Sequence, residues 1–274
     1  MKKFFTAVIL AVFIFSAQIA FAADVDWNSV PRINSKAQLA TYIENGRRSG
    51  QTEFNFVLTN FKLSNNKEIA DKELDRLVNE YCYSFATAPS VNLVGVMGTG
   101  QLTYRILKEY PGTRVANAYF SREPHMAWKN LTNEEQKLYN IAVRIVDKAN
   151  KLSSEKEKAR YIHDEICKHV KRYESHTNED AIGALIVGIT NCQGFTDAFY
   201  MLGRMCGLNV RKIGGRLNKN DVHAWNWITF VDGKSYCVDV TVDDTNNSHE
   251  YFLATYETMK QNHECDWSII PNLQ

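Results

Sequence analysis

Apolar positions in the first part of the chain recur with a helical period. Leu39, Tyr42 and Ile43 share one side of residues 35–47, and Ser35 stands before them as a plausible cap, so a helix is predicted there. A second helix is predicted over residues 67–81, where apolar residues again form one stripe.

Three strand-like runs lie in the same part of the chain. Thr52–Leu58 alternates apolar and polar residues and predicts a strand. Leu102–Tyr110 and Arg114–Phe120 are also predicted to be strands, joined by a turn at Pro111-Gly112. Residues 23–125 are therefore expected to form a small α+β domain, which contains no recognisable chemistry and serves packing, substrate positioning or an adaptor role.

Helical spacing continues after a predicted linker at residues 125–130. Thr132-Asn-Glu-Glu135 is a capping-box pattern, and Ser154 precedes a further helix. His163 and Cys167 lie one turn apart on that second helix. Two potential ligands do not define a metal site, so both are interpreted as ordinary helix residues and no metal is predicted.

The next predicted helix begins at a cysteine. Its apolar side is formed by Phe195, Phe199, Leu202 and Cys206, with Gly207 suited to its end and Asn191 or Thr190 to its start. Cys192 is thus expected in the first turn, where unpaired N–H groups and the helix dipole favour a thiolate and can help to hold an oxyanion. Gly194 is expected to keep the approach to the sulfur open. Alone, Cys192 could equally be a small apolar filler.

Two aromatic and β-branched runs, Val222–Val231 and Lys234–Thr241, predict a hairpin around Asp232-Gly233. Its loop length decides whether His223 and Asp239 share a face, because side chains alternate along a strand.

A two-residue turn would place the two side chains on opposite faces. A three-residue loop with a left-handed Gly233 pairs Phe230 with Lys234 and makes His223 and Asp239 diagonal neighbours. We therefore predict the three-residue loop.

Cys192, His223 and Asp239 together have the chemistry of a nucleophile, its base and the group that orients the base. Imidazole can activate a thiol near neutral pH, and a carboxylate fixes the tautomer of the imidazole and stabilises its charged form. Asn226 is a weaker alternative acceptor because it falls on the opposite strand face from His223.

The N-terminus has the layout of a signal peptide. Lys2 and Lys3 precede an apolar run over residues 4–19, and Ala20-Phe21-Ala22 provides a cleavage pattern. We predict cleavage after Ala22, a secreted or periplasmic location, and no stable membrane insertion afterwards. The alternative is a permanent anchor.

Charge and cysteine content narrow the picture further. The formal net charge of +1 gives no electrostatic basis for binding nucleic acid. Disulfides are open to an exported protein, but spacing does not reveal their pairing, and if Cys192 stays a thiol at least one further cysteine is unpaired. The six cysteines are Cys82, Cys167, Cys192, Cys206, Cys237 and Cys265.

Residues from about Leu131 to Leu253 resemble the transglutaminase-like superfamily, whose members have a papain-like core. The resemblance rests on an ordered set of segments, namely the helix Glu155–Tyr173, Asn191-Cys-Gln-Gly194, His223-Ala-Trp-Asn226, Asp232-Gly233 and Val238-Asp-Val-Thr-Val-Asp-Asp244.

The resemblance implies an α+β fold in which a helix bearing the cysteine packs on an antiparallel sheet bearing the histidine and aspartate, here over residues 131–274. It also implies Cys192 as nucleophile, His223 as base and Asp239 as orienter. Gln193, Trp225 and Tyr173 are tentative oxyanion or cleft residues, although Trp225 and Trp227 could instead pack the core. Without the flanking β-sandwich domains of the calcium-dependent cross-linkers, neither calcium nor a cofactor is expected.

Three functions remain open on this basis. The first is hydrolysis of an amide bond in a peptide, a protein or cell-wall peptide. The second is transfer of the acyl group to an amine, which cross-links proteins. The third is a catalytically inactive binding or adaptor module. The sequence does not indicate the substrate or the oligomeric state.

Overall fold

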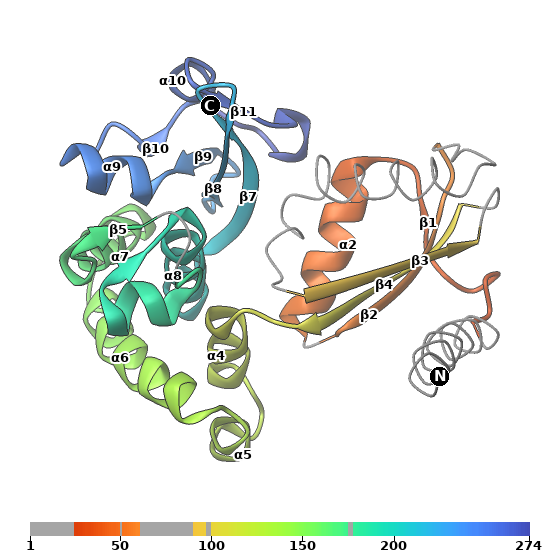
Figure 1. Ribbon diagram of the computed structural model, residues 1–274, viewed down its shortest axis with the longest axis horizontal. Coiled ribbons are helices and arrows are strands. Elements are labelled where there is room, and N and C mark those ends of the chain that lie inside the picture. The colour runs from red at the N-terminus through yellow and green to blue at the C-terminus, as the bar shows by residue number, and fades with distance from the viewer. Residues whose placement is uncertain (1–24, 50, 61–89, 97–99, 175–177) are drawn as a thin grey trace, which may run out of the picture.

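The computed structural model describes residues 25–49, 51–60, 90–96, 100–174 and 178–274. Over these residues the chain forms two main sheets, one in each half, with a group of helices packed beside the second (Figure 1). The α+β class is confirmed. The predicted signal peptide, the predicted helix at residues 67–81 and Cys82 lie outside the described residues.

The first sheet has the strand order β1-β2-β4-β3 and carries helix α2 across it (Figure 1). Ser35 caps α2 by accepting a hydrogen bond from the Gln38 N–H, as the sequence predicted. The predicted helix and two of the three predicted strands are confirmed. The elements are β1 (Arg32–Ile33), α2 (Lys36–Arg48), β2 (Glu53–Leu58), β3 (Ser90–Val96) and β4 (Gln101–Lys108).

The third predicted strand, Arg114–Phe120, is wrong. Those residues belong to helix α4 (Pro111–Tyr119), and Pro111 occupies its first turn, where a missing N–H costs nothing. The buried face of α4 joins the same apolar core as α8, and the Gly112 N–H donates to Asp197 on α8. The division of the chain near residues 125–131 therefore stays a proposal.

The predicted linker at residues 125–130 is largely helical, because helix α5 (Pro124–Lys129) covers most of it. Two longer helices follow, α6 (Asn133–Ala149) and α7 (Glu155–His169). Each begins with a complete capping box, formed by Thr132 with Glu135 and by Ser154 with Glu157. Both predicted helix starts are confirmed.

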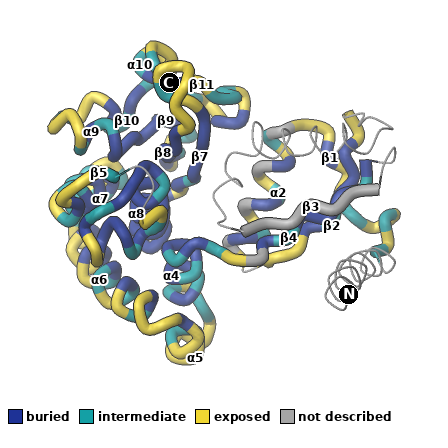
Figure 2. Tube along the Cα trace, in the orientation of Figure 1, coloured by how far each residue is buried: buried dark blue, intermediate teal, exposed yellow. Residues whose placement is uncertain are grey.

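Helix α8 (Cys192–Met205) lies at the centre of the second half and is almost wholly buried (Figure 2). Gly207 follows it with φ +80°, a left-handed conformation that suits glycine and closes the helix end. Three short elements lead into α8, namely β5 (Arg172–Tyr173), the π-helical turn η1 (Gly183–Val187) and β6 (Ile189–Thr190).

The second sheet is antiparallel and has the strand order β10-β9-β8-β7-β11. Val210 and Ile228 on one face pack in the core that contains α8, whereas Trp225 and Trp227 pack in a separate core on the other face. The elements are β7 (Asn209–Leu217), β8 (Asp221–Thr229), β9 (Ser235–Val238), α9 (Val240–Asn246), β10 (Phe252–Ala254), α10 (Tyr256–Met259), β11 (His263–Glu264) and η2 (Trp267–Ile269).

The β8–β9 hairpin has the register predicted from the sequence. The Phe230 N–H donates to the Lys234 carbonyl over 3.0 Å, and Gly233 has φ +80°, so the loop has three residues and a left-handed glycine. The predicted extent of the second strand to Thr241 is wrong. It ends at Val238, because the Asp239 side chain caps the short helix α9.

Two further features of the described chain concern its helices and its cysteines. Within those residues, no helix combines the length and apolarity needed to cross a bilayer. The five cysteines in the described ranges are all free thiols, namely Cys167, Cys192, Cys206, Cys237 and Cys265.

Candidate active site

Cys192 occupies the first turn of α8, as predicted. Asn191 is the N-cap, and its Oδ1 accepts from the Gln193 N–H at 3.0 Å and from the Gly194 N–H at 3.4 Å. Cys192 is 8% exposed and sits at the positive end of the helix dipole. This position stabilises a thiolate.

The capping by Asn191 changes two expectations about this turn. It occupies the Gln193 and Gly194 N–H groups, which were expected to be open to an oxyanion. Gly194 is needed for packing and not for access to the sulfur, because a Cβ there would lie 1.8 Å from Thr190 Oγ1 and 2.7 Å from the Asp180 carbonyl. Any oxyanion role of the Gln193 side chain remains a proposal.

His223 lies near the start of β8 and joins Cys192 to Asp239. Its Nε2 is 2.6 Å from Asp239 Oδ2, and the Cys192 side chain is near enough to raise the pKa of the imidazole, so Nδ1 is the ring nitrogen left for the sulfur. One turn after Cys192, the Thr196 carbonyl accepts from Asn226 in the middle of β8, so the first part of α8 packs directly on this strand. His223 and Asp239, which lie 31 and 47 residues after Cys192 in the sequence, thus belong to one buried cluster with it.

The charge state of His223 follows from this neighbourhood. Burial alone lowers the pKa of the imidazole, but the Asp239 carboxylate and the Cys192 sulfur outweigh it and raise the pKa to about 10. The imidazolium form is therefore favoured at neutral pH. A cationic imidazole beside the sulfur is the arrangement that stabilises a thiolate.

Asp239 is fully buried and all its oxygens are engaged. Oδ1 accepts from the Thr241 and Val242 N–H groups at 3.0 and 3.1 Å. Burial alone raises the pKa of Asp239, but His223 and His263 oppose it and hold the pKa of that carboxyl well below its usual range. The carboxylate is thus ionised and fixed in orientation.

His263 on β11 is a member of this cluster that the sequence reasoning missed. Its Nε2 lies 2.9 Å from Asp239 Oδ2, the same oxygen that His223 contacts. Nothing in the local sequence pattern signals it, because β11 has two residues and no periodicity. The register of β11 against β7 brings it to the site.

Part of the chain matches a known protein family. Residues 139–240 match the family model of the Transglutaminase-like superfamily. Residues 139–240 are a transglutaminase-like domain. The matched range contains Cys192, His223 and Asp239 but not His263.

Two solved structures align with this chain at low sequence identity. A crystal structure of a TGase aligns with TM-score 0.35 and 16% identity, over 77% of this chain and 59% of that chain. The periplasmic domain of TgpA from Pseudomonas aeruginosa aligns with TM-score 0.32 and 12% identity, over 55% of this chain and 56% of that chain. The chain thus spans less than two thirds of either structure. No curated protein matches the chain.

The tentative cleft residues fall into two groups, those buried in the core and those that reach solvent. Trp225 is 1% exposed and stacks beside His223 with ring centroids 6.0 Å apart, so it packs in the core and has no surface for a substrate. Trp227 is buried in the same core. Asn226 donates to Thr196 and Arg211 carbonyls and therefore does not serve His223.

Tyr173 remains a candidate for the cleft wall. It pairs with Thr190 directly before the catalytic helix and is 41% exposed. Burial is the main cause of its raised pKa, and the charges of Cys192, Asp221 and Asp239 add to it. Tyr173 thus lies at the boundary between this cluster and solvent.

His163 on α7 is a buried residue with a polar partner at each ring nitrogen, which the sequence interpretation did not anticipate. It is fully buried, its Nε2 lies 3.2 Å from Asp243 Oδ2 on α9, and its Nδ1 lies 3.0 Å from Asp164 Oδ1. His249 also contacts Asp164, and these three residues could geometrically hold a metal ion. Arg160 already pairs with the Asp164 carboxylate, so the contacts are satisfied without a metal.

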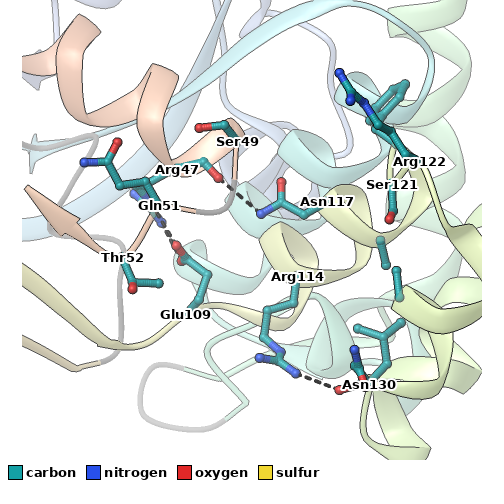
Figure 3. A pocket seen from close by; sticks show the side chains of 14 residues that line it. Arg47, Ser49, Gln51, Thr52, Glu109, Arg114, Asn117, Ser121, Arg122 and Asn130 are labelled. Atoms are coloured by element: carbon teal, nitrogen blue, oxygen red, sulfur yellow. Dashed lines mark hydrogen bonds and ion pairs between the residues drawn. The ribbon is translucent and has the colours of Figure 1, made fainter.

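The described part of the chain also contains a cavity of ≈ 720 Å³ (Figure 3). It is lined by the end of α2 and by α4 and α5, with Arg47 paired to Glu109 and Asn117 bonded to the Arg47 carbonyl. Asn117 also bonds Arg204, twelve residues after Cys192, which is about 18 Å along the helix. The cavity is therefore separate from the candidate active site.

Proposed function

We propose that this protein is an exported thiol enzyme that cleaves amide bonds in a peptide, a protein or cell-wall peptide through a thioester. The observation that carries the proposal is the buried His223 imidazole, whose Nε2 lies 2.6 Å from a buried carboxylate and whose pKa is raised by that carboxylate and by the Cys192 side chain. A small apolar filler at a helix start needs no such partner. Cys192 is therefore assigned as nucleophile, His223 as base and Asp239 as orienting residue.

The first half of the reaction forms the thioester. The Cys192 thiolate attacks the amide carbon, and the electron pair of the carbonyl moves to oxygen. As this pair returns, the C–N bond breaks and the His223 imidazolium gives its proton to the leaving amine. Asp239 holds the ring in the tautomer and orientation that this transfer requires, and stabilises its charged form.

The second half releases the acid. Water attacks the thioester carbon while neutral His223 takes one of its protons, and the C–S bond breaks to regenerate the thiolate–imidazolium pair. The backbone N–H of Cys192 is the remaining first-turn donor that could face the oxyanion in both halves.

Amine transfer is the second candidate function, and one observation favours it. Cys192 and His223 are only 8% and 4% exposed, so bulk water reaches the sulfur poorly. A primary amine that entered with its own binding contacts would then compete with water for the thioester. An inactive adaptor is the third candidate, and the complete hydrogen-bonded cluster speaks against it.

We also propose a cellular location for the protein and a role for its first sheet. The predicted cleavage after Ala22 would release residues 23–274 into the periplasm, the cell envelope or the medium. The β1–β4 unit would position the substrate or pack against the catalytic part. We propose no nucleic-acid partner, no metal and no cofactor, and no stable membrane contact after cleavage.

The acceptor can be identified with residues 23–274 incubated with a peptide-amide library and a biotin-tagged primary amine. We expect new free amines and a mass gain of one water in the cleaved products, and both should vanish in Cys192→Ala. Cys206→Ala, at the other end of the same helix, is the matched control and should retain turnover. Tagged peptides would instead establish amine transfer. Identical products from the wild type and Cys192→Ala would exclude both reactions.

A further inference from the structure

The Asp239 carboxylate receives two imidazoles on a single oxygen. His223 Nε2 lies 2.6 Å and His263 Nε2 2.9 Å from Oδ2, and the rings of the two histidines have centroids 5.7 Å apart. An ionised carboxylate only accepts hydrogen bonds, so both Nε2 atoms carry the hydrogen of these contacts. His263 is 1% exposed and has the same burial as the site it joins.

The second ring nitrogen of His263, Nδ1, also has a polar neighbour. Asn262 Oδ1 lies 2.7 Å from His263 Nδ1, and the Asn262 amide donates to the Tyr251 hydroxyl at 2.9 Å. The Asn218 N–H, just after β7, donates to the Asn262 carbonyl at 2.7 Å. His263 is thus held at both ring nitrogens.

Gly215 shows that the sheet accommodates β11 at close range. Gly215 lies opposite His223 in the β7–β8 register. A Cβ there would lie 2.2 Å from the Glu264 carbonyl and 2.6 Å from the Trp225 ring. Any larger residue at this position would push β11, and His263 with it, away from Asp239.

We propose that His263 is a positioning residue for the active site, which holds the Asp239 carboxylate at the same oxygen that His223 contacts. The inference rests on the proposed function, because it assigns a role within the same Cys192–His223–Asp239 cluster. Backbone N–H groups of α9 hold only Oδ1 of Asp239. Without His263, Asp239 Oδ2 keeps a single partner. The carboxylate can then rotate, and the His223 ring that it orients is held less firmly.

His263 also limits how strongly Asp239 acts on His223. Two donors share the negative charge of Oδ2, so each receives less than a sole donor would. Removing His263 should therefore stabilise the His223 imidazolium further and raise the pKa of His223. Besides His223 and His263, the titratable groups coupled to this cluster are Tyr173 from β5, Cys237 from β9 and Tyr251 before β10, and Cys192 from α8 acts on His223.

The test compares His263→Phe with His263→Gln in the full mature chain. Glutamine can place an amide donor near the position of Nε2, whereas phenylalanine fills the space without a donor. Without the second donor Asp239 and His223 lose their fixed orientation toward the sulfur, and we expect this loss to outweigh the higher pKa of His223. The second-order rate constant for iodoacetamide alkylation of Cys192 at pH 6 should therefore fall about tenfold in His263→Phe and recover largely in His263→Gln. The exposed His249→Phe is the matched control and should react like the wild type.

Two NMR readouts separate positioning from a loss of folding. With ¹⁵N-histidine labelling, the His223 titration should move to higher pH in His263→Phe, and His263 Nε2 in the wild type should be protonated. A wild-type His263 without a hydrogen on Nε2 would overturn the inference even if His263→Phe does not fold. Equal alkylation rates in the wild type, His263→Phe and His263→Gln would overturn it as well. If wild-type Cys192 reacts no faster than a free thiol, the proposed function itself fails.

Discussion

Asp239→Asn is expected to lower the rate of amide cleavage by about 10⁴-fold, while leaving α9 in place. An asparagine can keep the cap, because its side-chain oxygen can still accept from the Thr241 and Val242 N–H groups. The amide NH₂ then faces the Nε2 atoms of His223 and His263, where a donor meets a donor. His223 must take the other tautomer, and a comparable change in a Ser-His-Asp enzyme costs about 10⁴-fold.

The same substitution removes the charge that raises the pKa of His223. The pKa of His223 should fall toward that of an ordinary imidazole. As the pH rises, the imidazolium should therefore lose its proton, and the thiolate–imidazolium pair should disappear, at a lower pH than in the wild type. Measuring cleavage rate against pH in both proteins checks the size and the direction of this change. Asp232→Asn in the exposed hairpin loop is the control. A loss of less than tenfold in Asp239→Asn would show that Asp239 does not orient the base.

Lys212→Met is expected to cause the largest loss of stability among single substitutions in the catalytic half. Lys212 Nζ lies 2.6 Å from Asp197 Oδ1, and the two side chains are 3% and 1% exposed. Asp197 Oδ2 accepts from the N–H groups of Gly112 and Ala181, both at 3.0 Å. This ion pair therefore joins α8, β7, α4 and the start of η1.

Removing the ammonium leaves the Asp197 charge buried without its counterion, which costs about 3–5 kcal/mol of unfolding free energy. The rings of Tyr110 and Tyr200 lie 4.5 and 4.8 Å from Lys212 Nζ, so this contribution is lost as well. Urea unfolding of Lys212→Met beside the exposed Lys234→Met measures the difference. Equal unfolding free energies for these two variants would mean that the pair does not stabilise the fold.

The sequence predicted those parts of the site that depend on local patterns. Cys192 could be placed because its helix has a cap, an apolar stripe and a terminating glycine, all within the seventeen residues 191–207. The pairing of His223 with Asp239 could be placed because a hairpin register follows from loop length and strand alternation.

Elements whose conformation depends on tertiary contacts were less predictable. Arg114–Phe120 has strand-like residues, but Pro111 at the helix start and packing on α8 make it helical. Val240 and Thr241 favour a strand, yet the Asp239 cap turns them into α9. His263 depends on a two-residue strand that closes the sheet edge, and no local pattern encodes such a contact.

The most direct test of the nucleophile assignment is the alkylation rate of every cysteine at pH 6, followed by mass spectrometry. Burial raises the pKa of Cys167 and Cys237 to about 12 and that of Cys206 to about 11, and it also raises the pKa of Cys265. These thiols should stay almost unreacted, whereas Cys192 should be alkylated at least about 100-fold faster and lose this advantage in His223→Ala. Alkylation of Cys192 at the rate of the other cysteines would contradict its role as the nucleophile.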